Sequence, residues 1–104
     1  VSTINMGVFI PAGAVIQFGV AQVVTGLTSG GAATIAVNSE AAGDLIVALA
    51  VASWSDNAVI EGVDLIVAMV KTTVIRQLAI TIATAALTAG RFFYTCQYIE
   101  YAEV

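Results

Sequence analysis

The chain has 104 residues, of which 60% are hydrophobic and 10% charged, and its formal net charge is −4. This balance excludes a disordered chain, which has few apolar and many charged residues, and the length supports a single domain, residues 1–104. Only Lys71, Arg76 and Arg91 could neutralise phosphates, so we expect no nucleic-acid partner.

A membrane span is the first alternative to consider, because residues 1–39 contain no Asp, Glu, Lys or Arg. The most apolar stretch, Val8–Leu27, is interrupted by one proline, three glycines and two glutamines. A spanning helix needs about 20 predominantly apolar residues, and glycine and proline lower helix propensity. We therefore expect no membrane partner.

The apolar runs are rich in valine, isoleucine and threonine, which favour strands. Residues 1–6 are expected to form an extended N-terminal arm, followed by a short strand at Gly7–Ile10 and a turn at Pro11–Gly13. The longest predicted strand is Ala14–Thr25, in which Gly19 suits a bulge or bend.

The middle of the chain alternates short apolar runs with turn residues. We predict a loop at Thr28–Gly31, a strand at Ala32–Val37 and a second loop at Asn38–Gly43. Asp44–Trp54 is either a strand buried on both faces or a short helix, because periodicity does not separate the two in short apolar runs. Asp56–Gly62 is expected to be a polar connection.

The C-terminal part predicts strands at Val63–Val70 and within Lys71–Thr84, a turn at Ala85–Gly90 and a last strand at Arg91–Tyr101. Side chains alternate between the faces of a strand. One face of the last strand then carries Phe92, Tyr94, Cys96 and Tyr98, and the other carries Phe93, Thr95, Gln97 and Ile99. Both faces are largely apolar, as expected if one covers the core and the other meets a neighbour.

These elements predict an all-β chain with a single β-sandwich or jelly-roll-like domain. Ten charged residues must keep its surface soluble, whereas small soluble domains commonly carry about 25–35% charged residues there. Large apolar patches mark contacts with partners. We therefore expect sister copies or a larger assembly to cover part of the exterior.

No constellation for catalysis is found in the sequence. The chain has no histidine, so Cys96 has no such base to activate it, and a buried, inert thiol is the expected role. Asp56, Glu61 and Asp64 could bind calcium, but they lack the dense spacing of a calcium loop and are expected to be solvated. We predict no enzyme activity, no metal site and no cofactor.

The aromatic residues allow two interpretations. Stacked rings could form a sugar-binding platform, whereas packing in the core is the usual role of aromatic residues in strands. The residues concerned are Trp54, Phe92, Phe93, Tyr94, Tyr98 and Tyr101. A small carbohydrate-binding or fibre- or tail-associated β-sandwich module is therefore the alternative to an assembly protein.

A series of turn signals and apolar runs resembles small structural proteins of tailed bacteriophages, the capsid decoration or cement family. The matching segments are Phe9–Ile16, Gly31–Val37, Ala42–Leu45, Val70–Thr73, Leu78–Ile82, Leu87–Gly90 and Tyr94–Ile99. The resemblance extends from Val8 to Ile99 and rests on turn residues and apolar alternation. The chain has fewer charges than a freely solvated decoration protein needs.

This resemblance implies a homotrimer that contacts the major capsid protein on the outer surface of the virion and stabilises the shell, without catalytic residues. An extended arm can add a strand to a neighbouring sheet. The residues expected at an interface are those of the arm and two aromatics: Val1, Ser2, Thr3, Ile4, Asn5, Met6, Trp54 and Phe93.

Overall fold

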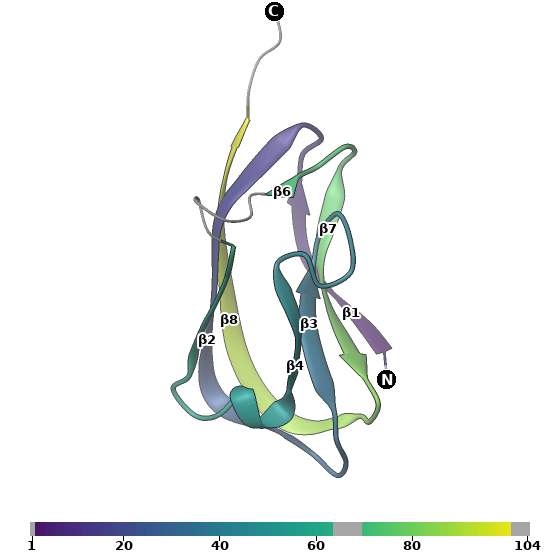
Figure 1. Cartoon of the computed structure of the whole chain (residues 1–104), viewed down its shortest axis with the longest axis vertical. Coiled ribbons are helices and arrows are strands. Elements are labelled where there is room, and N and C mark those ends of the chain that lie inside the picture. The colour runs from purple at the N-terminus through teal and green to yellow at the C-terminus, as the bar shows by residue number, and fades with distance from the viewer. Residues whose placement is uncertain (1, 64–69, 101–104) are drawn as a thin grey trace, which may run out of the picture.

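The computed structural model describes residues 2–63 and 70–100 of an elongated molecule with extents of 52 × 23 × 21 Å (Figure 1). Strands form almost all of its regular structure. In chain order the elements are β1 (Ser2–Ile10), β2 (Ala14–Ser29), β3 (Thr34–Asn38), β4 (Ile46–Ala50), the 3-10 helix η1 (Val51–Ser53), β5 (Val59–Val63), β6 (Val70–Lys71), β7 (Arg76–Ala83) and β8 (Leu87–Glu100). The prediction of an all-β chain is confirmed.

The first sheet has the strand order β1-β7-β3-β4, and its pairs are antiparallel. Residues 2–5 of the expected arm are extended, but they pair with Ile82–Ala79 of β7 within the same chain. The predicted division between an arm and a strand at Gly7–Ile10 is therefore wrong, because β1 is one strand whose register shifts between Asn5 and Phe9.

The second sheet is built around β2, which pairs with β5 and β6 and also with β8, all antiparallel. β2 and β8 run together as a long, curved pair (Figure 1). The turn before β2 contains Gly13 at φ +75°, a conformation that glycine adopts without a steric penalty, as the Pro-Ala-Gly sequence predicts.

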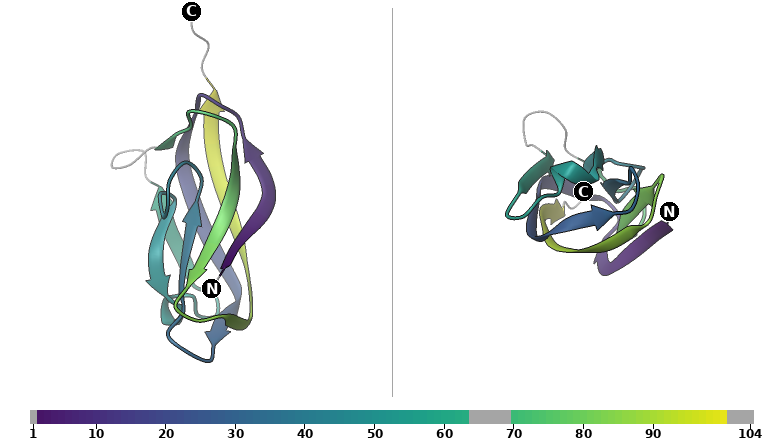
Figure 2. Two further views of the ribbon diagram at one scale, coloured as in Figure 1. Left: turned by 90° about the vertical axis from the view of Figure 1, so that its right-hand side faces the viewer. Right: turned by 90° about the horizontal axis from the view of Figure 1, so that it is seen from below.

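The core lies between the two sheets, which enclose it when the molecule is seen from below (Figure 2). Each sheet contributes alternate residues of its strands, as the two-residue period of a strand requires. The fully or almost fully buried members include Ile10, Ile16, Val23, Ile35, Val37, Leu45, Trp54 and Leu78.

Several predicted segments differ from the structure. β2 continues past Thr25 to Ser29, into the loop predicted at Thr28–Gly31, and β8 begins at Leu87, within the turn predicted at Ala85–Gly90. Asp44–Trp54 is neither a single strand nor a helix, since β4 is followed directly by η1. Asp56–Gly62 is wrong as a continuous polar connection, because β5 begins at Val59 and pairs with β2. Most of the strand predicted at Val63–Val70 lies outside the described residues.

β4 and β5 approach each other at one side of the molecule, where the two sheets meet. A Cβ added to Gly62 would collide with the backbone carbonyl of Leu45 and with the side chain of Ile46. Only glycine allows position 62 to lie this close to Leu45 and Ile46, so the two sheets are close together on the β4–β5 side.

Candidate interaction surface

Large apolar side chains are exposed over much of the molecule. The exposed ones are Ile4, Val8, Phe9, Phe18, Val24, Val47, Val59, Val74, Ile75, Phe93, Tyr98 and Ile99. Most of them lie on strands, where the backbone holds them in fixed positions, whereas Val74 and Ile75 lie in the connection between β6 and β7. Apolar surface of this extent is typical of proteins that contact partners.

Phe93, Thr95, Gln97 and Ile99, predicted to share one face of this strand, are the outward-facing residues of β8, and all four are exposed. Their inward-facing neighbours Phe92, Tyr94 and Cys96 are half-buried and pack against the core. The predicted alternation of the last strand is confirmed for these residues, whereas Tyr98, predicted on the same face as Phe92, is exposed. Phe93 has an exposed fraction of 60%, compared with 38% for Tyr98, the other exposed aromatic residue of this strand.

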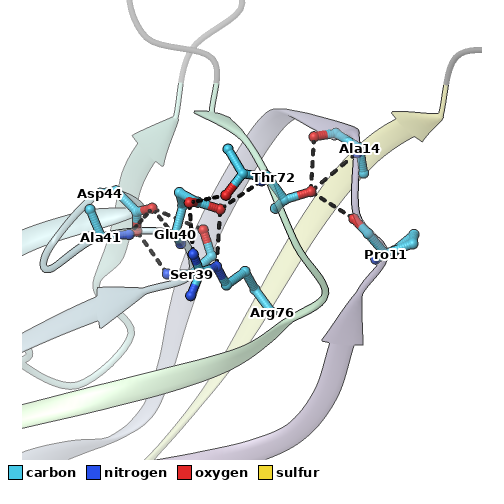
Figure 3. Close-up of polar contacts among 9 residues, drawn as sticks. Pro11, Ala14, Ser39, Glu40, Ala41, Asp44, Thr72 and Arg76 are labelled. Atoms are coloured by element: carbon cyan, nitrogen blue, oxygen red, sulfur yellow. Dashed lines mark hydrogen bonds and ion pairs between the residues drawn. The ribbon is translucent and has the colours of Figure 1, made fainter. Parts of the chain in front are cut away.

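The connection between β6 and β7 is fixed by one carboxylate (Figure 3). Glu40 accepts hydrogen bonds from the Thr73 backbone N–H at 2.9 Å and the Thr73 hydroxyl at 2.7 Å. It also accepts two from the Arg76 guanidinium, with Nε–Oε1 at 3.0 Å and Nη2–Oε2 at 2.8 Å. The hydrogen bonds from Arg76 and Thr73 lower the pKa of Glu40 to about 2.

Thr72 anchors the start of the same connection to the turn between β1 and β2. Its buried hydroxyl donates to the Pro11 carbonyl at 2.6 Å and accepts from the Ala14 N–H at 3.1 Å (Figure 3). Its backbone also pairs with Ala14 and Gly13. Thr72, Thr73 and Arg76 are all held by hydrogen bonds, so the apolar pair between them, here called the Val74–Ile75 tip, has a fixed position. The exposed fractions of Val74 and Ile75 are 50% and 63%.

The loop between β3 and β4 is ordered by Asp44, which accepts hydrogen bonds from the backbone N–H groups of Ser39, Glu40 and Ala41 at 2.8–3.0 Å. The Asn38 side chain accepts from the Gly43 N–H at 2.7 Å. These contacts position Glu40. Sequence reasoning missed the pair of Glu40 and Arg76, because no spacing rule relates a loop carboxylate to a strand residue 36 positions later.

The three acidic calcium candidates do not form a site in the structure. Asp56 accepts a hydrogen bond from the Gly26 N–H, Glu61 is exposed on β5, and Asp64 lies outside the described residues. In residues 2–63 and 70–100 no group of three metal-ligating side chains occurs.

Trp54, predicted at an interface, is fully buried, so that prediction is corrected: its ring packs against Phe92 with centroids 4.8 Å apart. Tyr94, a second ring on the same face of β8 as Phe92, is half-buried beside Gly19. The aromatic residues therefore form no continuous exposed row in the described chain, and Tyr101 lies outside it.

The remaining predicted interface residues are mostly accessible. Ser2, Thr3, Ile4 and Asn5 are exposed on β1, Met6 is half-buried against the core, and Val1 lies outside the described residues. Cys96 is a half-buried free thiol whose pKa is raised by burial, as expected for an unreactive cysteine.

An apolar pocket of about 420 Å³ opens between the two sheets. It lies between β1 and β7 on one side and the first half of β8 on the other. Its lining includes Ile4, Leu27, Ile80, Leu87, Arg91 and Phe92. The pocket is largely apolar and Arg91 is the charged residue in its lining, so it is better suited to packing against an apolar group than to catalysis.

Comparison with family models, with curated proteins and with solved structures finds no match to this chain. In the part of the chain that the structure describes, no helix has the length and apolar character to cross a membrane.

Proposed function

We propose that this chain is a virion structural protein that decorates a phage capsid and stabilises it through protein–protein contacts, without catalysis. The observation that carries the proposal is the exposure of large apolar side chains on rigid strands and on the pinned Val74–Ile75 tip. Apolar anchors held in place before binding lose little conformational entropy when a partner covers them.

In this proposal the tip contacts the major capsid protein on the outer surface of the shell. Its two side chains are large and apolar, with exposed fractions of 50% and 63%, and Glu40 holds the Thr73 backbone before them and the Arg76 side chain after them. The two sheets form a jelly-roll-like sandwich. The first half of β1 takes the role of the N-terminal arm and offers the exposed side chain of Ile4 to a neighbour.

The resemblance to decoration proteins implies a homotrimer, and closed symmetric oligomers are common for chains with such surfaces. A carbohydrate-binding module receives less support, because Trp54 is buried and Phe92 and Tyr94 face the core. A glycan array probed with the folded chain separates the two functions, since a decoration protein binds none of the sugars.

The direct test is co-sedimentation of the purified chain with empty shells assembled from the major capsid protein of the phage that encodes it. We expect saturable binding to these shells. The double variant V74S/I75S should reduce occupancy at least about tenfold, because it removes two apolar anchors. The matched control V47S/V59S removes two equally exposed valines from β4 and β5 and should bind normally. Absence of binding by the unmodified chain would contradict the proposal.

A further inference from the structure

The free edge of β8 lacks the features with which proteins protect a strand edge. In the described residues β8 pairs with β2 alone, so its other edge carries unpaired backbone groups. From Phe92 to Ile99 the strand contains no charged residue, no proline and no glycine. Edge strands that stay unpaired in solution usually carry lysine, proline or a bulge.

The backbone of this edge is also regular. Residues Arg91–Glu100 each have a partner on β2, and the unmatched residues in this part of the ladder lie on β2. The bulges therefore lie on β2, and β8 has no inserted residue in this part of the ladder. β1, the edge strand of the other sheet, differs, because its register shifts around Gly7, which has φ +75°. Of the two edges, β8 is the one suited to pairing.

The charges at the two ends of this segment select the partner. Arg91 lies at one end and Glu100 at the other, and neither has an ion-pair partner among the described residues. When two such strands pair antiparallel, the positive end of each lies beside the negative end of the other, whereas parallel pairing places like charges together. The edge is therefore complementary in charge to a second copy of itself.

We propose that β8 pairs antiparallel with β8 of a second copy about a two-fold axis centred on Cys96. In this register Phe93 faces Ile99 of the second copy on the outer surface, and both of these exposed side chains become partly covered. The register centred on Thr95 instead places Phe93 opposite Gln97. Directly opposed apolar pairs stabilise antiparallel strands, so the Cys96-centred register is favoured.

This inference rests on the assembly role proposed above and names one of its contacts. The contact is isologous, because the same residues contribute from both copies. It joins chains in pairs, and if the copies also form trimers, the two contacts together give six chains.

The first test is molar mass by light scattering without shells, for the unmodified chain and charge variants. We expect twice the 10.6 kDa chain mass or a higher even multiple. E100R and R91E should each raise the dissociation constant severalfold, and R91E/E100R should restore it, because each single variant places like charges at the neighbouring ends of the paired strands. E61R, the same charge change on the exposed Glu61 of β5, is the control. A monomer, a trimer alone, or a double variant as weak as the single ones would overturn the proposal.

The second test fixes the register by disulfide cross-linking. In a C96A background, F93C/I99C should form covalent dimers on mild oxidation with diamide, because the two positions face each other across the axis. F93C alone and I99C alone should not. Equal cross-linking by the single variants, or none by the double variant, would overturn this register. Because neither test contains shells, failure of the β8 pairing is distinguishable from failure of the chain to bind capsids.

Discussion

The Arg76 guanidinium and the Glu40 carboxylate form a two-point ion pair, with Nε–Oε1 and Nη2–Oε2 distances of 3.0 and 2.8 Å. The same carboxylate accepts two hydrogen bonds from Thr73. One acidic side chain thus holds both ends of the Val74–Ile75 tip, and its ionisation is linked to the stability of the fold.

The first prediction concerns pH. The folded-state pKa of Glu40, about 2, is below its ordinary value of 4.5, so its ionised form stabilises the folded chain above that value. This contribution is lost as the pH falls from about 4.5 to about 2. E40Q should therefore unfold at lower denaturant concentration than the unmodified chain at pH 7, and the difference should disappear near pH 2.

Denaturant unfolding followed by circular dichroism at several pH values measures this difference. E61Q, on the exposed Glu61 of β5, is the matched control for removing one carboxylate outside the contacts of Glu40. A difference between E40Q and the unmodified chain that stays constant down to pH 2 would contradict the linkage.

The second prediction concerns the buried hydroxyl of Thr72. T72V keeps the shape of the side chain but leaves the Pro11 carbonyl without this donor and removes an acceptor from the Ala14 N–H. We expect the free energy of unfolding to fall by about 1–3 kcal/mol. T25V, at an exposed position of β2, should change it by less than about 0.5 kcal/mol. Equal effects at the two positions would argue against a stabilising role of the Thr72 hydroxyl hydrogen bonds.

The third prediction uses the single tryptophan as a reporter of the core. Trp54 is fully buried, so its emission should be blue-shifted in the folded chain, resist iodide quenching and move to the red on unfolding. W54A should cost about 3–5 kcal/mol, because it leaves a cavity beside Phe92. W54F should cost less, since it retains the ring contact and removes an indole N–H that has no partner among the described residues. Strong quenching of the folded chain would show that Trp54 is accessible.

The fourth prediction tests the contact of Gly19 with Tyr94. A Cβ at position 19 would overlap the Tyr94 hydroxyl, so G19A should destabilise the chain by about 1–3 kcal/mol. Y94F removes a buried hydroxyl without a partner among the described residues and should be neutral or stabilising.

The double variant G19A/Y94F should recover part of the loss, because the closest atom is gone while the ring remains. A double-mutant cycle of unfolding free energies gives the coupling between the two positions. Strict additivity of the two substitutions would contradict the predicted overlap.

The all-β class and the faces of the last strand could be predicted, because the alternation of Phe92, Tyr94 and Cys96 with Phe93 and Thr95 follows directly from strand geometry. β5 was missed because it lies in a segment whose Asp56, Asn57 and Glu61 suggest a loop. Its pairing with β2 determines the strand, and a single sequence does not contain that long-range information.

The candidate surface was harder to predict than the fold. Aromatic character alone marked Trp54 for an interface, whereas the structure buries it against Phe92. The Val74–Ile75 tip is apolar in a segment expected to begin as a polar strand, and its rigidity depends on Glu40, which is distant in sequence. Which apolar residues remain exposed is decided by the packing of the two sheets.

The arrangement of the two terminal strands has a mechanical consequence. β1 begins in the lower half of the molecule and β8 ends at the top (Figure 1), and each is paired with an antiparallel neighbour, β1 with an interruption between Asn5 and Phe9. Tension applied between these two points acts along the strands and loads many backbone hydrogen bonds at once instead of opening them one after another. A chain built in this way resists being stretched along its long axis.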